Sequence, residues 1–263
     1  MTDVREKQHD DVLLQERPSE GVLALIFNRP DRRNALNGPM YQGMARALRA
    51  ARLDDAVKVV LISGAQGYFT SGNDLTDFIG YDRRDEFLPA AFLRELSSLD
   101  KPVVAAVEGG AIGVGATMLL HCDFVQAGRS TKFHMPFIHL NVCPEGGSSV
   151  LVPARAGARR AARWLLLGEP FGADEALAGD LVSEVVDDGA ALVSAQAVAV
   201  RLAALSPQAL QASKRLLRGD LPALQAAMAV ELERFTELLV QPSAQQALQR
   251  MTSGKSRAGS AAA

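Results

Sequence analysis

The sequence predicts an α/β protein, and three observations support that prediction. Over the first two thirds of the chain, short apolar segments typical of buried strands alternate with helical segments. Residues 58–64 and 102–107 form continuous apolar runs, as expected of strands that are covered on both faces. From residue 146 onward the pattern becomes almost purely helical, with one short strand possible at residues 181–186.

The expected elements follow one another in repeated strand–loop–helix units. The predicted strands are apolar runs bounded by polar or glycine-containing turns: residues 12–16, 22–27, 58–64, 102–107, 123–126 and 131–134. The predicted helices show helical apolar spacing or are rich in alanine and leucine: residues 39–53, 86–99, 114–121, 189–205, 207–218 and 221–239. A turn is expected at residues 17–21, between the first two strands.

The chain is long enough for one large core. It has 263 residues, of which 48% are hydrophobic, near the upper end of what a single domain holds. We expect a core at residues 1–200 and a helical region at residues 201–263 that packs on the core or on a neighbouring subunit. The small polar stretch at residues 253–260 is expected to form a flexible tail.

Composition excludes several classes of function. The net charge of −2 gives no global basic field that would recruit nucleic acid or an anionic membrane. No signal-peptide pattern and no 18-residue apolar run occurs, so we expect no membrane segment. The four histidines and two cysteines lack metal-binding spacing, so no metal site is expected. Isolated thiols in apolar runs fit a cytoplasmic protein.

Two glycine-containing turns are candidates for an anion-stabilising site. Gly72 follows a buried strand, where it permits a tight turn that can leave the next backbone amide unpaired. Residues 108–115 join a strand to a helix, and amides in the first turn of a helix have no intrahelical acceptor. Two such donors could form an oxyanion hole. Ordinary strand-to-helix connections explain the residue types alone as well, because glycine turns after strands are common. The G-x-G-x-x-G spacing of dinucleotide sites is absent.

Glu145 is the best candidate for proton transfer. It follows Pro144 in a largely apolar stretch, where apolar neighbours such as Val142 would make a carboxylate more basic. The alternative is an acid in the first turn of a helix, favoured by the helix dipole. The residue pattern alone does not decide between these two roles.

Three motifs together resemble the crotonase superfamily of acyl-CoA enzymes, the enoyl-CoA hydratase/isomerases. Residues 28–36 (NRPDRRNAL) look like its CoA-loop signature, residues 71–75 (SGNDL) its first oxyanion segment and residues 109–115 its second. The match runs in order from about residue 12 to beyond residue 250. It implies a spiral of repeated ββα units with a C-terminal helical trimerisation region, assembled as a homotrimer or hexamer.

The resemblance also implies roles for particular residues. The oxyanion donors would be the backbone amides of Asn73 and Val114, although the family usually has glycine at the position of Val114. The implied substrate-binding residues are Arg33, Ala35, Leu36, Ser71, Gly72, Asp74, Leu75, Gly113 and Phe137. Arg32 and Arg33 are placed either to meet CoA phosphates or simply to be solvated.

The departures from the family pattern indicate the reaction. A family hydratase carries two glutamates, and here their positions are occupied by Thr117 and Phe137, with a carboxylate reappearing as Glu145. The segments around these residues most resemble the peroxisomal-type Δ3,Δ2-enoyl-CoA isomerases. We therefore expect an acyl-CoA isomerase that uses no metal or redox cofactor, with CoA as part of the substrate. The alternatives are another crotonase reaction, such as hydration, hydrolysis or dehalogenation, and a non-catalytic acyl-CoA-binding protein.

Overall fold

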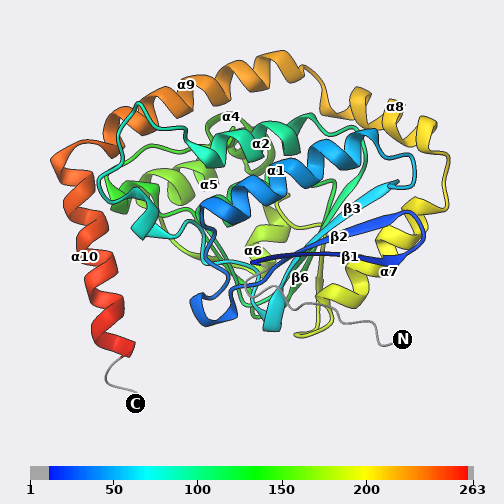
Figure 1. Cartoon of the computed structure of the whole chain (residues 1–263), viewed down its shortest axis with the longest axis horizontal. Helices are drawn as coiled ribbons and strands as arrows, with labels where there is room; N and C mark the ends of the chain where they lie inside the picture. Colours follow the sequence, from blue (N-terminus) through cyan, green and yellow to red (C-terminus); the bar gives the residue numbers. More distant parts are fainter. Residues whose placement is uncertain (1–11, 260–263) are drawn as a thin grey trace, which may run out of the picture.

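The computed structural model describes residues 12–259 and contains two β-sheets (Figure 1). The six-stranded sheet has the order β1 (Leu13–Ser19), β2 (Val22–Phe27), β3 (Val59–Gly64), β4 (Val103–Val107), β6 (Phe124–Gly128) and β9 (Glu184–Val186). The three-stranded sheet has the order β5 (Gly110–Ile112), β7 (Lys132–His134) and β8 (Phe171–Gly172). Among the strand pairs formed by residues 12–259, only β1/β2 and β7/β8 are antiparallel.

Helices flank and extend the sheets. They are α1 (Gly38–Leu53), α2 (Leu88–Ser98), α3 (Val114–Thr117), α4 (Ser148–Ala156), α5 (Ala158–Ala162), α6 (Ala173–Ala178), α7 (Ala191–Ala203), α8 (Pro207–Arg218), α9 (Leu221–Leu239) and α10 (Pro242–Gly259). Short 3-10 turns include η3 (Leu75–Phe78), η4 (Met118–His121) and η5 (Phe137–Leu140). None of the helices between residues 12 and 259 combines the length and apolar character needed to span a bilayer.

The large sheet is covered on both faces, which explains its continuous apolar strands. Alternate residues of β2, β3 and β4, such as Val22, Leu61 and Val104, pack on one side against the alanines of α7. The intervening residues, such as Leu25 and Ile62, belong to the main core on the other side. The sequence-based α/β prediction is therefore confirmed.

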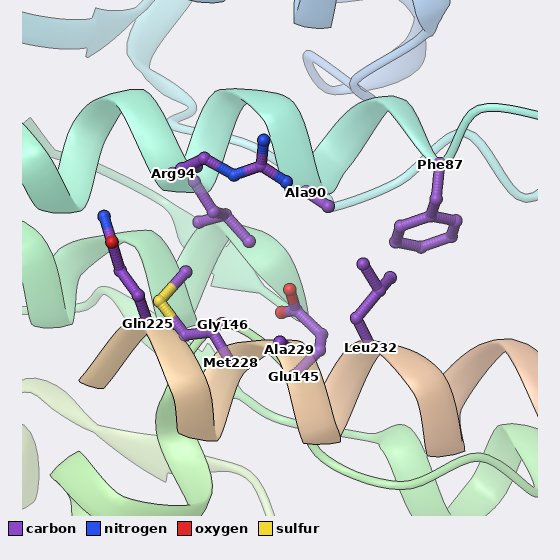
Figure 2. A pocket seen from close by; sticks show the side chains of 10 residues that line it. Phe87, Ala90, Arg94, Glu145, Gly146, Gln225, Met228, Ala229 and Leu232 are labelled. Carbon is purple, nitrogen blue, oxygen red and sulfur yellow. The ribbon is translucent and has the colours of Figure 1, made fainter. Parts of the chain in front are cut away.

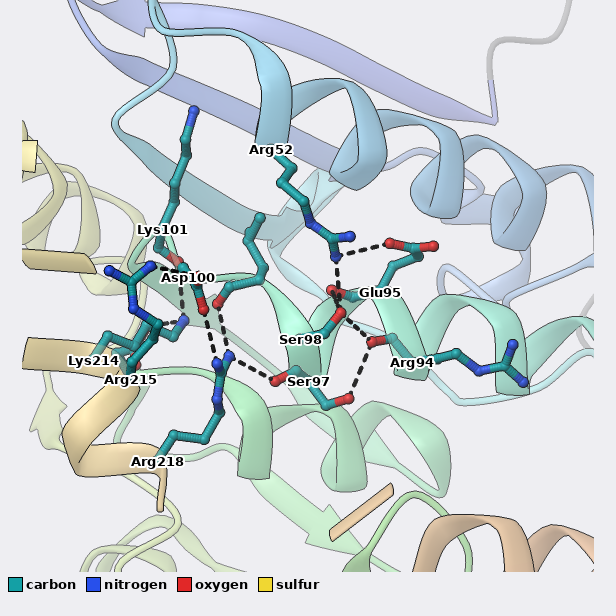
Figure 3. Close-up of polar contacts among 12 residues, drawn as sticks. Arg52, Arg94, Glu95, Ser97, Ser98, Asp100, Lys101, Lys214, Arg215 and Arg218 are labelled. Carbon is teal, nitrogen blue, oxygen red and sulfur yellow. Dashed lines mark hydrogen bonds and ion pairs between the residues drawn. The ribbon is translucent and has the colours of Figure 1, made fainter. Parts of the chain in front are cut away.

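The C-terminal helices are fastened to the core by polar contacts. Arg215 and Arg218 of α8 both form ion pairs with Asp100, in the loop between α2 and β4 (Figure 3). Lys214 donates to the Lys101 carbonyl and pairs with Asp123. Helix α9 then runs across α2 and α4, and α10 descends along one edge of the molecule (Figure 1). The division near residue 200 stays a prediction, since α7 crosses that position while lying on the sheet.

The structure corrects several sequence-based boundaries. Strand β1 continues to Ser19, so the predicted turn at residues 17–21 shrinks to Glu20 and Gly21. Strand β5 lies within a stretch expected to be a glycine turn, because pairing with β7 orders it. The helix predicted at residues 114–121 is α-helical only to Thr117 and continues as η4. Helix α10 extends through the stretch expected to be a flexible tail as far as Gly259, residues 260–263 lie outside the described part, and the flexibility of the tail stays a prediction.

Candidate active site

The two glycine turns predicted to carry amide donors lie directly against each other. Thr70 and Ala111 form a parallel bridge, with hydrogen bonds from the Thr70 amide to the Gly110 carbonyl and from the Ile112 amide to the Thr70 carbonyl. Gly72 has φ +83°, and a Cβ added there would lie 2.5 Å from the Ile112 carbonyl oxygen. Only glycine fits this contact without displacing backbone. The close approach brings the two turns into one site.

The two candidate donors have the local geometry expected of free amides. The Leu36 amide donates to the Gly72 carbonyl, and the Asp74 amide donates to the Leu36 carbonyl. This parallel bridge directs the intervening Asn73 amide away from Leu36. Val114 is the first residue of α3, so its amide has no intrahelical acceptor. Among residues 12–259, neither amide has a backbone acceptor. Both amides can therefore donate to a substrate oxygen.

The segment that resembles the CoA loop runs beside the first turn. The Ser71 amide donates to the Arg33 carbonyl at 2.9 Å, and the Asp74 amide donates to the Leu36 carbonyl at 2.8 Å. Arg29 ties the two segments together by donating to Asp74 and to the Ala35 carbonyl. Most of the predicted substrate-binding residues are thus brought together, although the Asp74 carboxylate is already engaged by Arg29 and Thr76.

Glu145 lies in the loop before α4 and is buried, with only 5% of the residue exposed. Its Oε1 accepts a hydrogen bond from the Thr117 hydroxyl at 2.5 Å. Burial raises the pKa of Glu145 to about 7; the nearby Glu231 carboxylate adds to the rise and the Thr117 hydrogen bond opposes it. A carboxylate with such a pKa can both accept and return a proton near neutral pH. Thr117, which the resemblance places where a hydratase carries a glutamate, is the side chain that donates this hydrogen bond to Glu145.

The alternative role considered for Glu145, an acid at a helix start, is filled by another residue. Glu231 of α9 accepts hydrogen bonds from the amides of Gly147, at 2.6 Å, and Ser149, at 2.8 Å. These amides lie at the start of α4, where backbone donors have no helical partner. Glu231 was not identified from the sequence, because it lies more than eighty residues away on a helix with no motif of its own.

An apolar pocket adjoins Glu145 between α2 and α9 (Figure 2). Its empty space, including the open mouth, is about 540 Å³. The lining residues are Phe87, Ala90, Leu93 and Arg94 from α2 and its start, Glu145 and Gly146 from the loop, and Gln225, Met228, Ala229 and Leu232 from α9. Apart from Glu145, none of these residues was predicted to belong to the site, since the pocket forms only where α9 crosses α2.

Tyr41 is a second site residue that the sequence did not reveal. It is buried on α1, and its hydroxyl donates a hydrogen bond to the Asn73 side chain. Burial, with the nearby Glu145 and Asp77 carboxylates, raises the pKa of Tyr41 well above its usual value. Tyr41 therefore stays protonated and holds the side chain of Asn73, whose amide is the first candidate oxyanion donor.

Other candidates lie away from the pocket. Phe137 is buried in η5 and is not among the residues that line the pocket beside Glu145. Arg33 is exposed and stands 5.9 Å from the centre of the Tyr68 ring. His134 and His139 both hydrogen-bond to the Gly168 carbonyl, in agreement with a packing role. Within the described chain, no group of three or more His, Cys, Asp or Glu residues is arranged to hold a metal ion.

Comparison with known proteins defines the class to which this site belongs. The profile of the enoyl-CoA hydratase/isomerase family matches residues 17–255. The chain therefore belongs to that family, within the crotonase superfamily, and is an enzyme of acyl-CoA chemistry.

Individual relatives differ in the reactions that their names give. The chain is 36% identical to the 2,3-dehydroadipyl-CoA hydratase of Escherichia coli K12 over 82% of its length and 86% of that protein. It is 35% identical to human enoyl-CoA delta isomerase 2 over 76% of its own length. The match covers about half, 52%, of the human protein. In structure it is similar to Pseudomonas aeruginosa OdaA, with a TM-score of 0.88, 39% identity, and 92% and 99% of the two chains covered.

Proposed function

We propose that the protein is an acyl-CoA isomerase that moves a double bond from C3 to C2 of an enoyl-CoA. The observation that supports this most directly is Glu145, a buried carboxylate with a pKa of about 7 beside the two oxyanion turns. By the family resemblance, the positions of a hydratase's two glutamates hold Thr117 and Phe137, and neither of these side chains can supply a carboxylate for water addition.

The reaction needs only proton movement. The Glu145 carboxylate takes a proton from C2, and the C–H electron pair moves into the C2–C1 bond as the thioester oxygen becomes negatively charged. The amides of Asn73 and Val114 stabilise that oxygen in the dienolate. Protonated Glu145 then returns the proton to C4, the electrons of the dienolate shift back, and the double bond lies between C2 and C3. No metal or redox cofactor is required by these steps, and CoA enters as part of the substrate.

The resemblance further leads us to propose a trimer or a hexamer built through the C-terminal helices. Two leucines on α8, Leu216 and Leu217, are 84% and 87% exposed, which supports a subunit contact on that helix. An apolar surface of this kind is unfavourable in water unless a partner covers it.

The substitution Glu145→Gln tests the proposed reaction. It keeps the size and the hydrogen bond acceptor of the side chain but removes the base, so isomerisation of 3-hexenoyl-CoA should fall by about 10³-fold or more, a loss typical of removing a catalytic acid–base group. In deuterated water the native protein should exchange label at C2 and C4, and E145Q should not. Binding of hexanoyl-CoA should persist in E145Q. Retained turnover in that variant would disprove the assignment.

A further inference from the structure

The pocket beside Glu145 has an apolar end and a polar end. Along α2 the lining residues run from Phe87 through Ala90 to Arg94, a helical span of about 10 Å. Along α9 they run in the opposite direction, so that Leu232 lies near Phe87 and Gln225 lies at the end marked by Arg94 (Figure 2). The Glu145 carboxylate lies between the two ends (Figure 2). A chain lying along this pocket would pass Glu145 and end near a cation and an amide.

The apolar end is the one connected to the first glycine turn, which contains Asn73. Phe87 also lines a neighbouring pocket that contains Leu36 and Tyr41. Leu36 pairs with Asn73 through the backbone, and Tyr41 bonds to the Asn73 side chain. If the thioester oxygen is held at Asn73, as the proposed function requires, then the acyl chain extends from the Phe87 end toward Arg94 and Gln225.

Arg94 and Gln225 have polar groups available for a ligand. Within residues 12–259, the exposed Arg94 guanidinium forms no ion pair, and the half-buried Gln225 side chain forms no hydrogen bond. The neighbouring Glu95 points away from Arg94 toward Arg52, with which it forms an ion pair (Figure 3), and it also pairs with Arg49. A guanidinium and an amide at one end of an apolar pocket match a carboxylate, which accepts hydrogen bonds and carries the opposite charge.

We infer that the preferred substrate carries a second carboxylate at the far end of its acyl chain, bound by Arg94 and Gln225. The substrate class is thus the CoA monothioester of an unsaturated dicarboxylic acid. The inference rests on the proposed function for the direction in which the acyl chain lies. The inference adds a specificity to that function, because an ordinary fatty acyl chain has no terminal carboxylate for Arg94 and Gln225 to bind.

Saturated acyl-CoAs test this inference by calorimetric titration, because they bind without reacting. The mono-CoA thioesters of adipic and suberic acid are compared with hexanoyl-CoA and octanoyl-CoA, so that the contribution of CoA cancels. At least one dicarboxylic ligand should bind about tenfold more tightly than its uncharged counterpart, as expected for one charge-assisted hydrogen bond. The preference should shrink in high salt, because part of the site is exposed.

Variants assign that preference to the proposed residues. Arg94→Met should reduce the ratio of affinities to about one, and Arg94→Lys should keep part of it. Arg46→Met is the matched control: Arg46 is an exposed arginine on α1 that does not line the pocket, so this variant should keep the full ratio. Equal binding of charged and uncharged ligands by the native protein, or an unchanged ratio in R94M, would overturn the inference.

The titrations, together with the isomerisation assay on 3-hexenoyl-CoA, separate this inference from the proposed function. A carboxylate preference without isomerisation of any 3-enoyl-CoA rejects the isomerase and keeps the carboxylate site. Isomerisation of 3-hexenoyl-CoA without a preference in binding rejects the carboxylate site and keeps the isomerase. Both outcomes are read from the intact protein.

Discussion

The two halves of the candidate active site are built in different ways. The oxyanion half is made of backbone: two turns held together by strand bridges and by the fit of Gly72 against Ile112. The carboxylate half is made of side chains from distant segments. Thr117 donates a hydrogen bond to Glu145, and Glu231 accepts one from the nearby Gly147 amide. Backbone donors are fixed by short local motifs, whereas the properties of an acid are set by whatever the rest of the fold places around it.

Among changes that leave Glu145 in place, substitution of Gly72 should reduce the rate of isomerisation most, because it disrupts the contact between the two backbone turns. Gly72→Ala places a methyl group 2.5 Å from the Ile112 carbonyl oxygen at φ +83°, so the two turns must separate. We expect isomerisation to fall by about 10²–10³-fold, as for the loss of an oxyanion donor, together with a lower melting temperature. Steady-state kinetics and thermal unfolding measure the two effects.

Gly67 provides the matched control for that experiment. It also has positive φ, +69°, but an added Cβ meets no atom within 4 Å. Gly67→Ala should therefore cost only about 1 kcal/mol of backbone strain and leave the rate almost unchanged. Equal rates in G72A and G67A would show that contact between the turns does not matter to catalysis.

Substitution of Glu231 tests the carboxylate half without changing Glu145 itself, because Glu231 holds the backbone that follows Glu145. Glu231→Ala removes the acceptor for the Gly147 and Ser149 amides, which should destabilise the fold by about 2–4 kcal/mol and lower kcat by about tenfold. Glu231→Gln, which keeps one acceptor, should fall between. Glu233→Ala, an exposed acid on the same helix, serves as the control and should match the native protein in melting temperature and kcat. An E231A protein as stable and as active as E233A contradicts the proposed support.

The difference between the halves explains what the sequence could and could not predict. The glycine turns at Gly72 and at residues 108–115 could be recognised because a glycine turn after a strand is a local pattern, and the family resemblance then implied the amides of Asn73 and Val114 as donors. Tyr41 and Glu231 lie on helices whose sequence shows only amphipathic spacing, and their contacts form when α1 and α9 pack on the core. Strands β5 and β8 were missed for the same reason, since pairing across the small sheet orders very short segments.

The smallest expected effect concerns Thr117, and it appears in the pH profile rather than in the rate. The Thr117 hydrogen bond favours the ionised form of Glu145 and so lowers its pKa, while burial, the larger influence, raises the pKa to about 7. Because the base must be ionised to accept the C2 proton, kcat/KM should rise with pH through that pKa and level off above it. Thr117→Val removes the donor, so the midpoint should move upward by about one pH unit.

Thr117→Ser retains the hydroxyl and should restore the native midpoint, while the rate at high pH should be similar in all three proteins. A merely structural role for Thr117 would lower the whole profile without moving it. If the profile of T117V has the native midpoint, the Thr117 hydroxyl does not set the pKa of Glu145. The carboxylate half would then depend on burial by α2 and α9 and on Glu231 alone.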